Sequence, residues 1–169
     1  MNLPEIEDYF EKMGEKKFRA KQVYEWLWLK PVQHFDGMTN ISKDLRQKLA
    51  AEFTLPGLTV DTVQNSEDGT IKTRFKTHDG HFIEGVLIPT KSRFTACVSS
   101  QIGCSLSCKF CATGYIDRKR NLDFDEIYDQ VVILNQQCEK THGKKLSNIV
   151  FMGMGEPLLN YKNVIRSVE

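Results

Sequence analysis

The hydrophobic period of the chain changes twice along its length, and this restricts the folds that it can adopt. Up to about residue 55, apolar residues recur at the spacing that one face of an α-helix requires. Between residues 58 and 90 they alternate with polar residues, as in a half-buried strand. Beyond residue 93 two short apolar runs flank a long helical pattern, and the order strand, helix, strand is typical of parallel β/α units.

Three helices are predicted in the first part of the chain. Pro4 suits a first helical turn, and Gly14 suits a C-terminal cap. Pro31 should stop the second helix, and Ser42 can cap the third. Residues 1–55 should therefore form a small helical domain. Its apolar helix positions are Ile6, Tyr9, Phe10, Met13, Phe18, Val23, Trp26, Leu27, Ile41, Leu45 and Leu49.

The middle of the chain predicts an antiparallel meander. Two Asp-Gly pairs, at residues 68–69 and 79–80, are strong hairpin signals, because both turn positions need a positive φ that glycine tolerates fully. We expect residues 56–92 to form an antiparallel β extension. Its strands should lie near 58–65, 70–77 and 81–89.

The last part, residues 93–169, carries the β/α pattern. Asp123 and Glu126 have the spacing of a helix capping box, and Gly143 follows the end of the predicted helix. Only 76 residues run from Phe94 to Glu169, whereas a complete (β/α)₈ barrel takes roughly 250. The predicted class is therefore α/β: a partial (β/α) barrel preceded by a helical domain and an antiparallel β segment.

Composition favours an ordinary globular protein. Hydrophobic residues make up 40% of the chain and charged residues 27%. The longest aliphatic run, Val131–Leu134, is far shorter than the roughly 20 apolar residues of a membrane span, and no basic-then-apolar leader precedes Pro4. We therefore expect a cytoplasmic protein with no membrane partner. The formal charge of +1 neither supports nor excludes nucleic-acid binding.

Three of the five cysteines, Cys104, Cys108 and Cys111, form a C-x3-C-x2-C motif directly after a predicted strand. This pattern fits a metal site in a reducing compartment better than a disulfide framework. Three thiolates match three irons of a four-iron cluster and leave the fourth iron open for a small ligand. A structural zinc would need a fourth ligand, which Cys97, Cys138 or a histidine could supply.

Longer motifs around these cysteines resemble those of a known family. Phe110 precedes the last cysteine, as in the cluster motif of the radical S-adenosylmethionine (SAM) enzymes. More narrowly, the chain is similar to the RlmN/Cfr family of RNA adenine methyltransferases. The matching motifs are Cys97–Cys104 (CVSSQIGC), Phe110–Gly114 (FCATG), Arg120–Leu122 (RNL), Met152–Asn160 (MGMGEPLLN) and, similar to the family's RNA-binding accessory domain, Phe18–Val23 with Trp26 and Leu27.

The resemblance implies a cofactor site. In the family three cysteines bind a [4Fe–4S] cluster whose open iron chelates the amino and carboxylate groups of SAM, which assigns these roles to Cys104, Cys108 and Cys111. A Gly-rich segment after the second barrel strand contacts the SAM amino group, which carries over to Gly155 and Glu156. Without the cysteine motif, this segment would be interpreted as an ordinary turn at the end of a strand.

Two catalytic roles rest on the same resemblance. Cys97 corresponds to the cysteine that resolves a covalent enzyme–RNA intermediate through a transient disulfide. From the residues alone, a buried core cysteine is the better interpretation. Glu84 corresponds to the proton acceptor for adenine C2, although a lone Glu in an alternating strand is usually solvated.

The implied reaction methylates C2 of an adenine in 23S ribosomal RNA, and in transfer RNA as a further substrate, through a methyl-cysteine intermediate. It needs two SAM molecules and a reductant protein such as flavodoxin. The methyl-carrying cysteine should lie beyond residue 169, because Cys138 lies on the predicted helix, so we expect this chain alone to be inactive. Asp117 and Arg118 stand where the family has Gly-Phe, a departure near the cluster motif.

Other interpretations stay open at the level of sequence. The same motifs occur in C8-specific adenine methyltransferases of the family, and a metal-bound module could recognise RNA without chemistry. Two basic stretches, Lys16–Lys21 and Arg118–Arg120, could contact RNA phosphates, although such runs are more often solvated faces.

Overall fold

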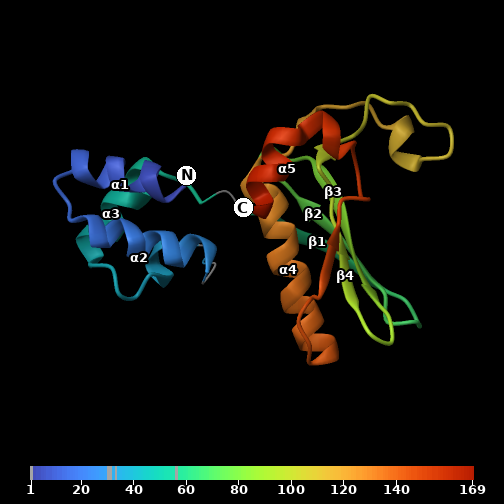
Figure 1. Cartoon of the computed structure of the whole chain (residues 1–169), viewed down its shortest axis with the longest axis horizontal. Coiled ribbons are helices and arrows are strands. Elements are labelled where there is room, and N and C mark those ends of the chain that lie inside the picture. The colour runs from blue at the N-terminus through green and yellow to red at the C-terminus, as the bar shows by residue number, and fades with distance from the viewer. Residues whose placement is uncertain (1, 30–31, 33, 56) are drawn as a thin grey trace. The chain divides into compact units, whose positions relative to one another are not determined.

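The computed structural model describes residues 2–29, 32, 34–55 and 57–169, in two compact units, Met1–Pro56 and Gly57–Glu169 (Figure 1). Pro31, predicted to stop the second helix, lies outside the described residues. Within the described ranges, no helix is long and apolar enough to cross a membrane.

The first unit is helical, as predicted. Its elements are α1 (Leu3–Lys12), α2 (Lys17–Trp28), the short 3₁₀ helix η1 (Phe35–Gly37) and α3 (Lys43–Glu52). Asn2 and Glu5 form a capping box at the start of α1, which satisfies two backbone N–H groups that the helix leaves free. Gly14 follows the α1 C-cap with a φ of +74°, as its position in the sequence predicts. The buried core is Ile6, Phe10, Ala20, Val23, Phe35, Met38, Ile41, Leu45 and Leu49.

The second unit is built on one mixed sheet in the order β1-β2-β3-β4-β7. Each of the first four strands pairs antiparallel with the next one in the chain: β1 (Thr59–Asn65), β2 (Ile71–Lys76), β3 (Phe82–Pro89) and β4 (Phe94–Cys97). β7 (Asn148–Val150) then pairs parallel to β4. The three hairpin strands match the predicted ranges, and they continue directly into the parallel pair.

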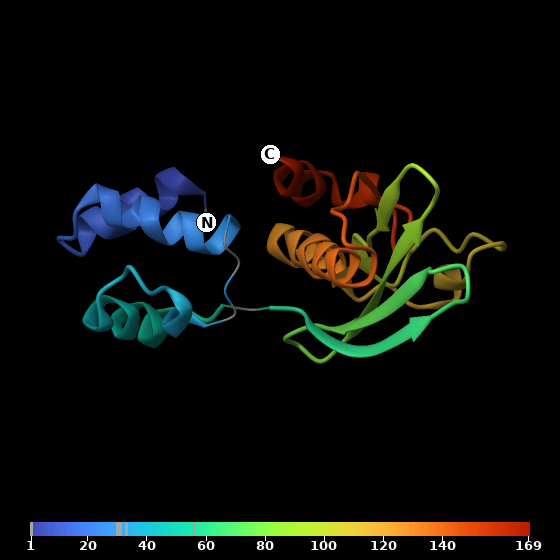
Figure 2. The same ribbon diagram turned by 90° about the horizontal axis from the view of Figure 1, so that it is seen from below.

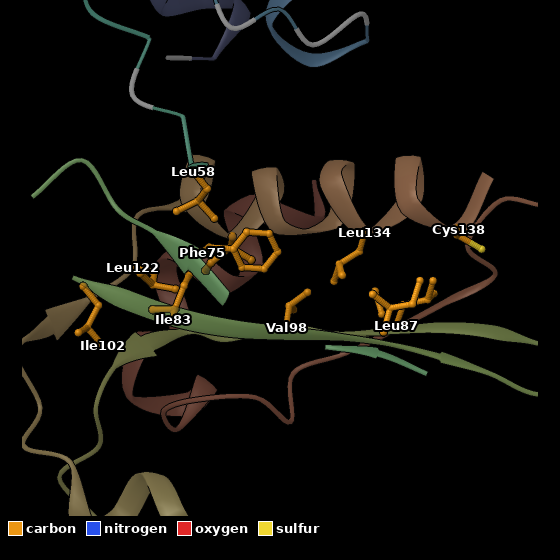
Figure 3. Close-up of a cluster of buried hydrophobic side chains, with 12 residues drawn as sticks. Leu58, Phe75, Ile83, Leu87, Val98, Ile102, Leu122, Leu134 and Cys138 are labelled. Atoms are coloured by element: carbon orange, nitrogen blue, oxygen red, sulfur yellow. The ribbon is translucent and has the colours of Figure 1, made fainter. Parts of the chain in front are cut away.

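The helix α4 (Phe124–His142) joins β4 to β7 and covers one face of the sheet (Figure 3). Asp123 and Glu126 form its capping box, and Gly143 ends it with a φ of +65°, as predicted. Leu134 and Cys138 of α4 are buried against the sheet, whose inward side chains include Ile83 and Leu87. The helix α5 (Tyr161–Val168) packs beside α4 (Figure 2). The strand–helix–strand unit is therefore present.

A small second sheet was not predicted from the sequence. β5 (Gln101–Ile102) pairs antiparallel with β6 (Arg120–Asn121), and the segment between them, which we call the cysteine loop (103–119), contains the 3₁₀ helix η2 (Ala112–Tyr115). This loop projects from the sheet (gold in Figure 1). A further 3₁₀ helix, η3 (Pro157–Asn160), leads into α5.

Candidate functional site

The cysteine loop is closed at its base by backbone contacts. The Cys104 N–H donates to the Ile116 carbonyl at 3.1 Å, just inside the β5–β6 pair. Gly103, with a φ of +73°, lies so close to the other end of the loop that a Cβ there would be 2.7 Å from the Asp117 carbonyl carbon. Gly114 similarly packs on the Cys108 backbone, with its Cβ position 2.7 Å from the Cys108 oxygen. Both contacts require glycine, because any side chain would displace the facing backbone.

The three cysteines of this loop fit an iron–sulfur cluster in chemistry but do not form a prearranged ligand set. Cys104, Cys108 and Cys111 are free and half-buried, and the Cys111 N–H donates to the Cys108 carbonyl at 3.0 Å. Among the residues that the structure describes, no three His, Cys, Asp or Glu side chains are placed to hold a metal ion. The loop therefore carries three thiols, which are the donors that such clusters use, on one closed segment. The three cysteine side chains must turn toward one another before they can bind a cluster together.

A second loop, residues 151–156, follows β7 and lies against the segment after β4; we call it the Gly-rich loop. The Met154 carbonyl accepts from the N–H groups of Ser100 and Gln101, at 2.9 and 3.2 Å. A Cβ on Gly153 would be 2.8 Å from the Val98 carbonyl, and one on Gly155 would be 2.8 Å from the Gln101 nitrogen. Gly155 also has a φ of +92°. These glycines allow the two backbones to lie in direct contact.

Glu156, the other residue predicted to contact SAM, makes structural contacts in this chain. Its carboxylate accepts from the Leu158 N–H at 3.1 Å and so caps η3. Its N–H donates to Oε1 of Gln101 at 2.9 Å. The structure therefore places Gly155 and Glu156 at the carboxyl end of β7, in contact with the strand end that leads to the cysteines.

Four polar side chains hold this arrangement together. Gln101 and Gln130 are fully buried, and Gln130 of α4 both accepts from the Ser99 N–H (2.8 Å) and donates to the Ser99 carbonyl (3.0 Å). Asn160 donates to the carbonyls of Ser100 and Leu122, each at 2.8 Å. The fourth, Asn121 of β6, accepts from Gln101 at 2.7 Å. In the sequence Gln101, Asn121 and Asn160 are parts of longer motifs with no sign of these contacts, and no local pattern points to Gln130.

Cys97 and Glu84 lie on the face of the sheet opposite α4. Ala96 points into the core, so its neighbour Cys97 points away from it; Cys97 pairs with Val86, two residues from Glu84 on β3. Such a diagonal pair on adjacent strands is about 7–8 Å apart between Cα atoms. Burial raises the pKa of the Cys97 thiol, and a hydrogen bond from the Met152 backbone opposes this in part.

Glu84 has a partner in the neighbouring strand. Its carboxylate forms an ion pair of 2.9 Å with Lys72 of β2, and both side chains are more than two-fifths exposed. Its backbone carbonyl accepts from the Ser99 hydroxyl at 2.6 Å. The pair holds the carboxylate on the open face of the sheet, and its exposed position makes it easy to break.

Arg120 of the second basic stretch is held by two carboxylates. Its guanidinium makes two hydrogen bonds to Asp79, in the β2–β3 turn, and two to Glu126, at 2.6–3.0 Å. The Arg120 hydrogen bonds hold the pKa of the Asp79 carboxyl well below its usual range. Arg120 therefore stabilises the base of the cysteine loop through these ion pairs. Arg118 and Lys119 are the exposed cations of the stretch.

The helical unit and the whole chain both match known proteins. Residues 1–55 match the family model described as the ribosomal RNA large subunit methyltransferase N-terminal domain. Two curated relatives, each named probable dual-specificity RNA methyltransferase RlmN, come from Cytophaga hutchinsonii (54% identical over 100% of this chain) and Christiangramia forsetii (56% over 98%). The chain spans about half the length of these relatives, 46% and 47% respectively.

A solved structure also matches the chain. A radical SAM methyltransferase from Sphaerobacter thermophilus is 41% identical, with a TM-score of 0.90. The match covers 99% of this chain and 49% of the other. At this identity the likeness extends to sequence as well as fold.

Proposed function

The chain belongs to the RlmN family of radical SAM methyltransferases, corresponding to their N-terminal portion, and we propose that it forms the cluster-binding part of an enzyme that methylates C2 of an adenine in 23S ribosomal RNA. Transfer RNA is a second substrate class in this proposal, because the relatives of this chain are named as dual-specificity enzymes.

One observation carries the proposal: the Gly-rich loop starts at the carboxyl end of β7, and it is hydrogen-bonded to the segment that leads from the carboxyl end of the parallel strand β4 to the cysteine loop. Met154 binds the backbone of Ser100 and Gln101, directly before the cysteine loop begins at Gly103. The carboxyl ends of parallel strands are where β/α folds place their ligand sites. Two loops meeting there can bind one ligand between them.

In the proposed site Cys104, Cys108 and Cys111 hold a [4Fe–4S] cluster, with SAM as its ligand. When bound, the cluster supplies the electron that cleaves SAM reductively, and a reductant protein such as flavodoxin renews that electron. Backbone groups near Gly155 can approach the SAM amino group, because glycine at this position leaves no side chain in the way. Glu156 keeps this turn in place through its cap on η3.

Glu84 and Cys97 supply the proton and thiol chemistry in this proposal. Glu84 accepts the proton from adenine C2, and Cys97 resolves the covalent RNA adduct. Their common position on the open face of the sheet supports these roles, because both can face one base. The raised pKa keeps the Cys97 thiol protonated at neutral pH, and therefore unreactive until a base removes its proton. All five cysteines are free, which suits work in a reducing compartment such as the cytoplasm.

The test is anaerobic reconstitution with iron and sulfide, followed by electron paramagnetic resonance of the reduced protein with and without SAM. We expect a four-iron signal that shifts when SAM is added, and its loss in Cys108→Ala. Cys138→Ala is the matched control, because Cys138 is buried in α4, away from the cysteine loop. Zinc without iron in the wild-type protein would contradict the proposal and favour a non-catalytic RNA-binding module.

The position of methylation needs a separate measurement. The full-length protein should convert adenosine in a 23S RNA fragment to 2-methyladenosine, identified by chromatography and mass spectrometry of the digested RNA. The product 8-methyladenosine would replace the C2 assignment by the related C8 activity. Replacing Glu84 by Gln should abolish product while leaving the cluster signal unchanged.

A further inference from the structure

Gln101 lies where the two loops of the candidate site meet. Its side chain is fully buried, and its amide makes one hydrogen bond in each direction. Oε1 accepts from the Glu156 N–H of the Gly-rich loop at 2.9 Å. Nε2 donates to Oδ1 of Asn121, in β6 at the base of the cysteine loop, at 2.7 Å. One side chain therefore spans the bases of both loops.

Asn121 continues the connection. Its Oδ1 also accepts from Arg118 at 3.0 Å, and its Nδ2 donates to the Leu159 carbonyl of η3 at 3.3 Å. Gly155 packs directly on the Gln101 side chain, where a Cβ would be 2.7 Å from Gln101 Cγ. The position of the Gly-rich loop is thus set by Gln101 through both a hydrogen bond and close packing.

We propose that Gln101 is a positioning residue that fixes the Gly-rich loop relative to the cysteine loop, so that the two meet one SAM molecule in a fixed geometry. The inference rests on the proposed function, since it concerns the ligand of that site. Gln101 itself need not touch SAM. Its effect passes through the Glu156 N–H and through Asn121, which are held at the distances given above.

Its chemistry suits this role. A buried amide has both a donor and an acceptor, so it can satisfy a backbone N–H on one side and a carbonyl-type oxygen on the other without burying a charge. A buried hydrophobic residue of similar size would leave the Glu156 N–H and the Asn121 oxygen without these partners. We therefore expect Gln101→Met to keep the three thiols but to loosen the junction between the two loops.

Thr73→Val is the matched control. Thr73 of β2 is equally buried, and its hydroxyl donates to Oε1 of Gln137 at 3.0 Å, a hydrogen bond that joins α4 to the sheet and involves neither loop. Both substitutions remove buried hydrogen bonds, so both should lower the unfolding midpoint. Only Gln101→Met should change how SAM binds.

The experiment uses the full-length protein, reconstituted anaerobically, with SAM titrated against the signal of the reduced cluster. In Gln101→Met we expect wild-type iron content and an unaltered signal without SAM, together with about tenfold more SAM needed for half of the shift, as is typical of residues that orient a ligand-binding shell. Thr73→Val should need the wild-type SAM concentration.

Two outcomes would overturn the inference: a Gln101→Met titration within twofold of wild type, or an equal weakening in Thr73→Val, which would show a general loss of stability. Failure of the wild-type protein to show any SAM-dependent shift would instead refute the proposed function. The wild-type titration thus separates the two failures.

Discussion

Replacing Arg120 by alanine should destabilise the second unit strongly, because it leaves a buried carboxylate without its counter-charge. The Glu126 side chain is only 4% exposed, and it accepts from the Arg120 guanidinium at 2.6 and 2.8 Å. Without Arg120, the Asp123 N–H at 2.9 Å and His78 at 3.6 Å remain near it.

The magnitude follows from the burial of the two carboxylates. Breaking a buried ion pair by removing one partner costs about 3–5 kcal/mol. Asp79 is 32% exposed, so its pair adds under about 1 kcal/mol. Since Arg120 is itself 27% exposed, we expect the lower end of the range, about 3 kcal/mol.

Urea unfolding can measure this change because the two units have different probes. Both tryptophans, Trp26 and Trp28, lie in the first unit, so their fluorescence should follow the helical domain alone. Far-ultraviolet circular dichroism also follows the second unit. Arg120→Ala should move the dichroism midpoint by about 1 M urea or more.

Controls isolate the buried charge as the cause. Lys119→Ala removes a neighbouring exposed cation and should change the free energy of unfolding by less than about 0.5 kcal/mol. Adding Glu126→Gln to Arg120→Ala should recover part of the loss, since no charge is then left buried. The low pKa of Asp79 means that its pair stabilises the fold above about pH 4 and is lost on strong acidification, so acidification should remove under about 1 kcal/mol of the difference between the variant and wild type. An Arg120→Ala midpoint equal to that of Lys119→Ala would refute the reasoning.

Three further substitutions test other parts of the structure. Gly155→Ala should lower the free energy of unfolding by about 2 kcal/mol or more, because the φ of +92° and the contact with Gln101 both exclude a Cβ. Urea unfolding and SAM titration should both detect the change. Gly80→Ala is the control: it has open space around it and should lose only the energy of the strain at its φ of +82°. Leu134→Ala should cost about 2–5 kcal/mol by opening a cavity under α4, against little change for the exposed Leu158→Ala. Burial raises the pKa of Asp129 to about 6, so this carboxyl group destabilises the folded state increasingly as the pH rises from about 4 through 6. Asp129→Asn can still accept a hydrogen bond from the Leu58 N–H. This substitution should therefore stabilise the chain by about 1–2 kcal/mol at pH 8 and hardly at all at pH 4, as measured by urea unfolding at both pH values.

Local signals were sufficient to predict most of the elements. The hairpins predicted at Asp68–Gly69 and Asp79–Gly80 form, and both glycines adopt a positive φ. The predicted turn type was wrong, because Asp68 and Asp79 do not adopt a positive φ, and each hairpin has a three-residue loop that ends at the glycine. The ends of α4 follow from Asp123, Glu126 and Gly143, which act within one turn of the helix. Such signals depend on residues three or four positions apart, so a single sequence contains them in full.

The contacts that build the site could not be predicted in this way. Arg120 meets Asp79 across 41 positions of sequence, and Asn160 meets Ser100 across 60. The basic stretch at 118–120 gave no sign that Arg120 is taken up by carboxylates while its neighbours are exposed. β5 and β6 are only two residues long, too short to show a period. The roles of Glu84, Cys97 and the cluster cysteines stay predictions.

Contacts within the chain hold the base of the cysteine loop in place, but they do not hold its tip. The base of the cysteine loop is held by Gly103, the β5–β6 pair, Gln101 and Arg120, and none of these contacts needs a cofactor. Toward the tip the thiols do not converge, and Phe110 is 93% exposed. Because converging three thiols then requires only side-chain and tip movement, cluster binding should protect the backbone amides at 105–115 from hydrogen exchange while leaving those at 100–102 and 120–122 unchanged. Equal protection of base and tip would mean that the cofactor also builds the base, contrary to the hydrogen bonds seen here.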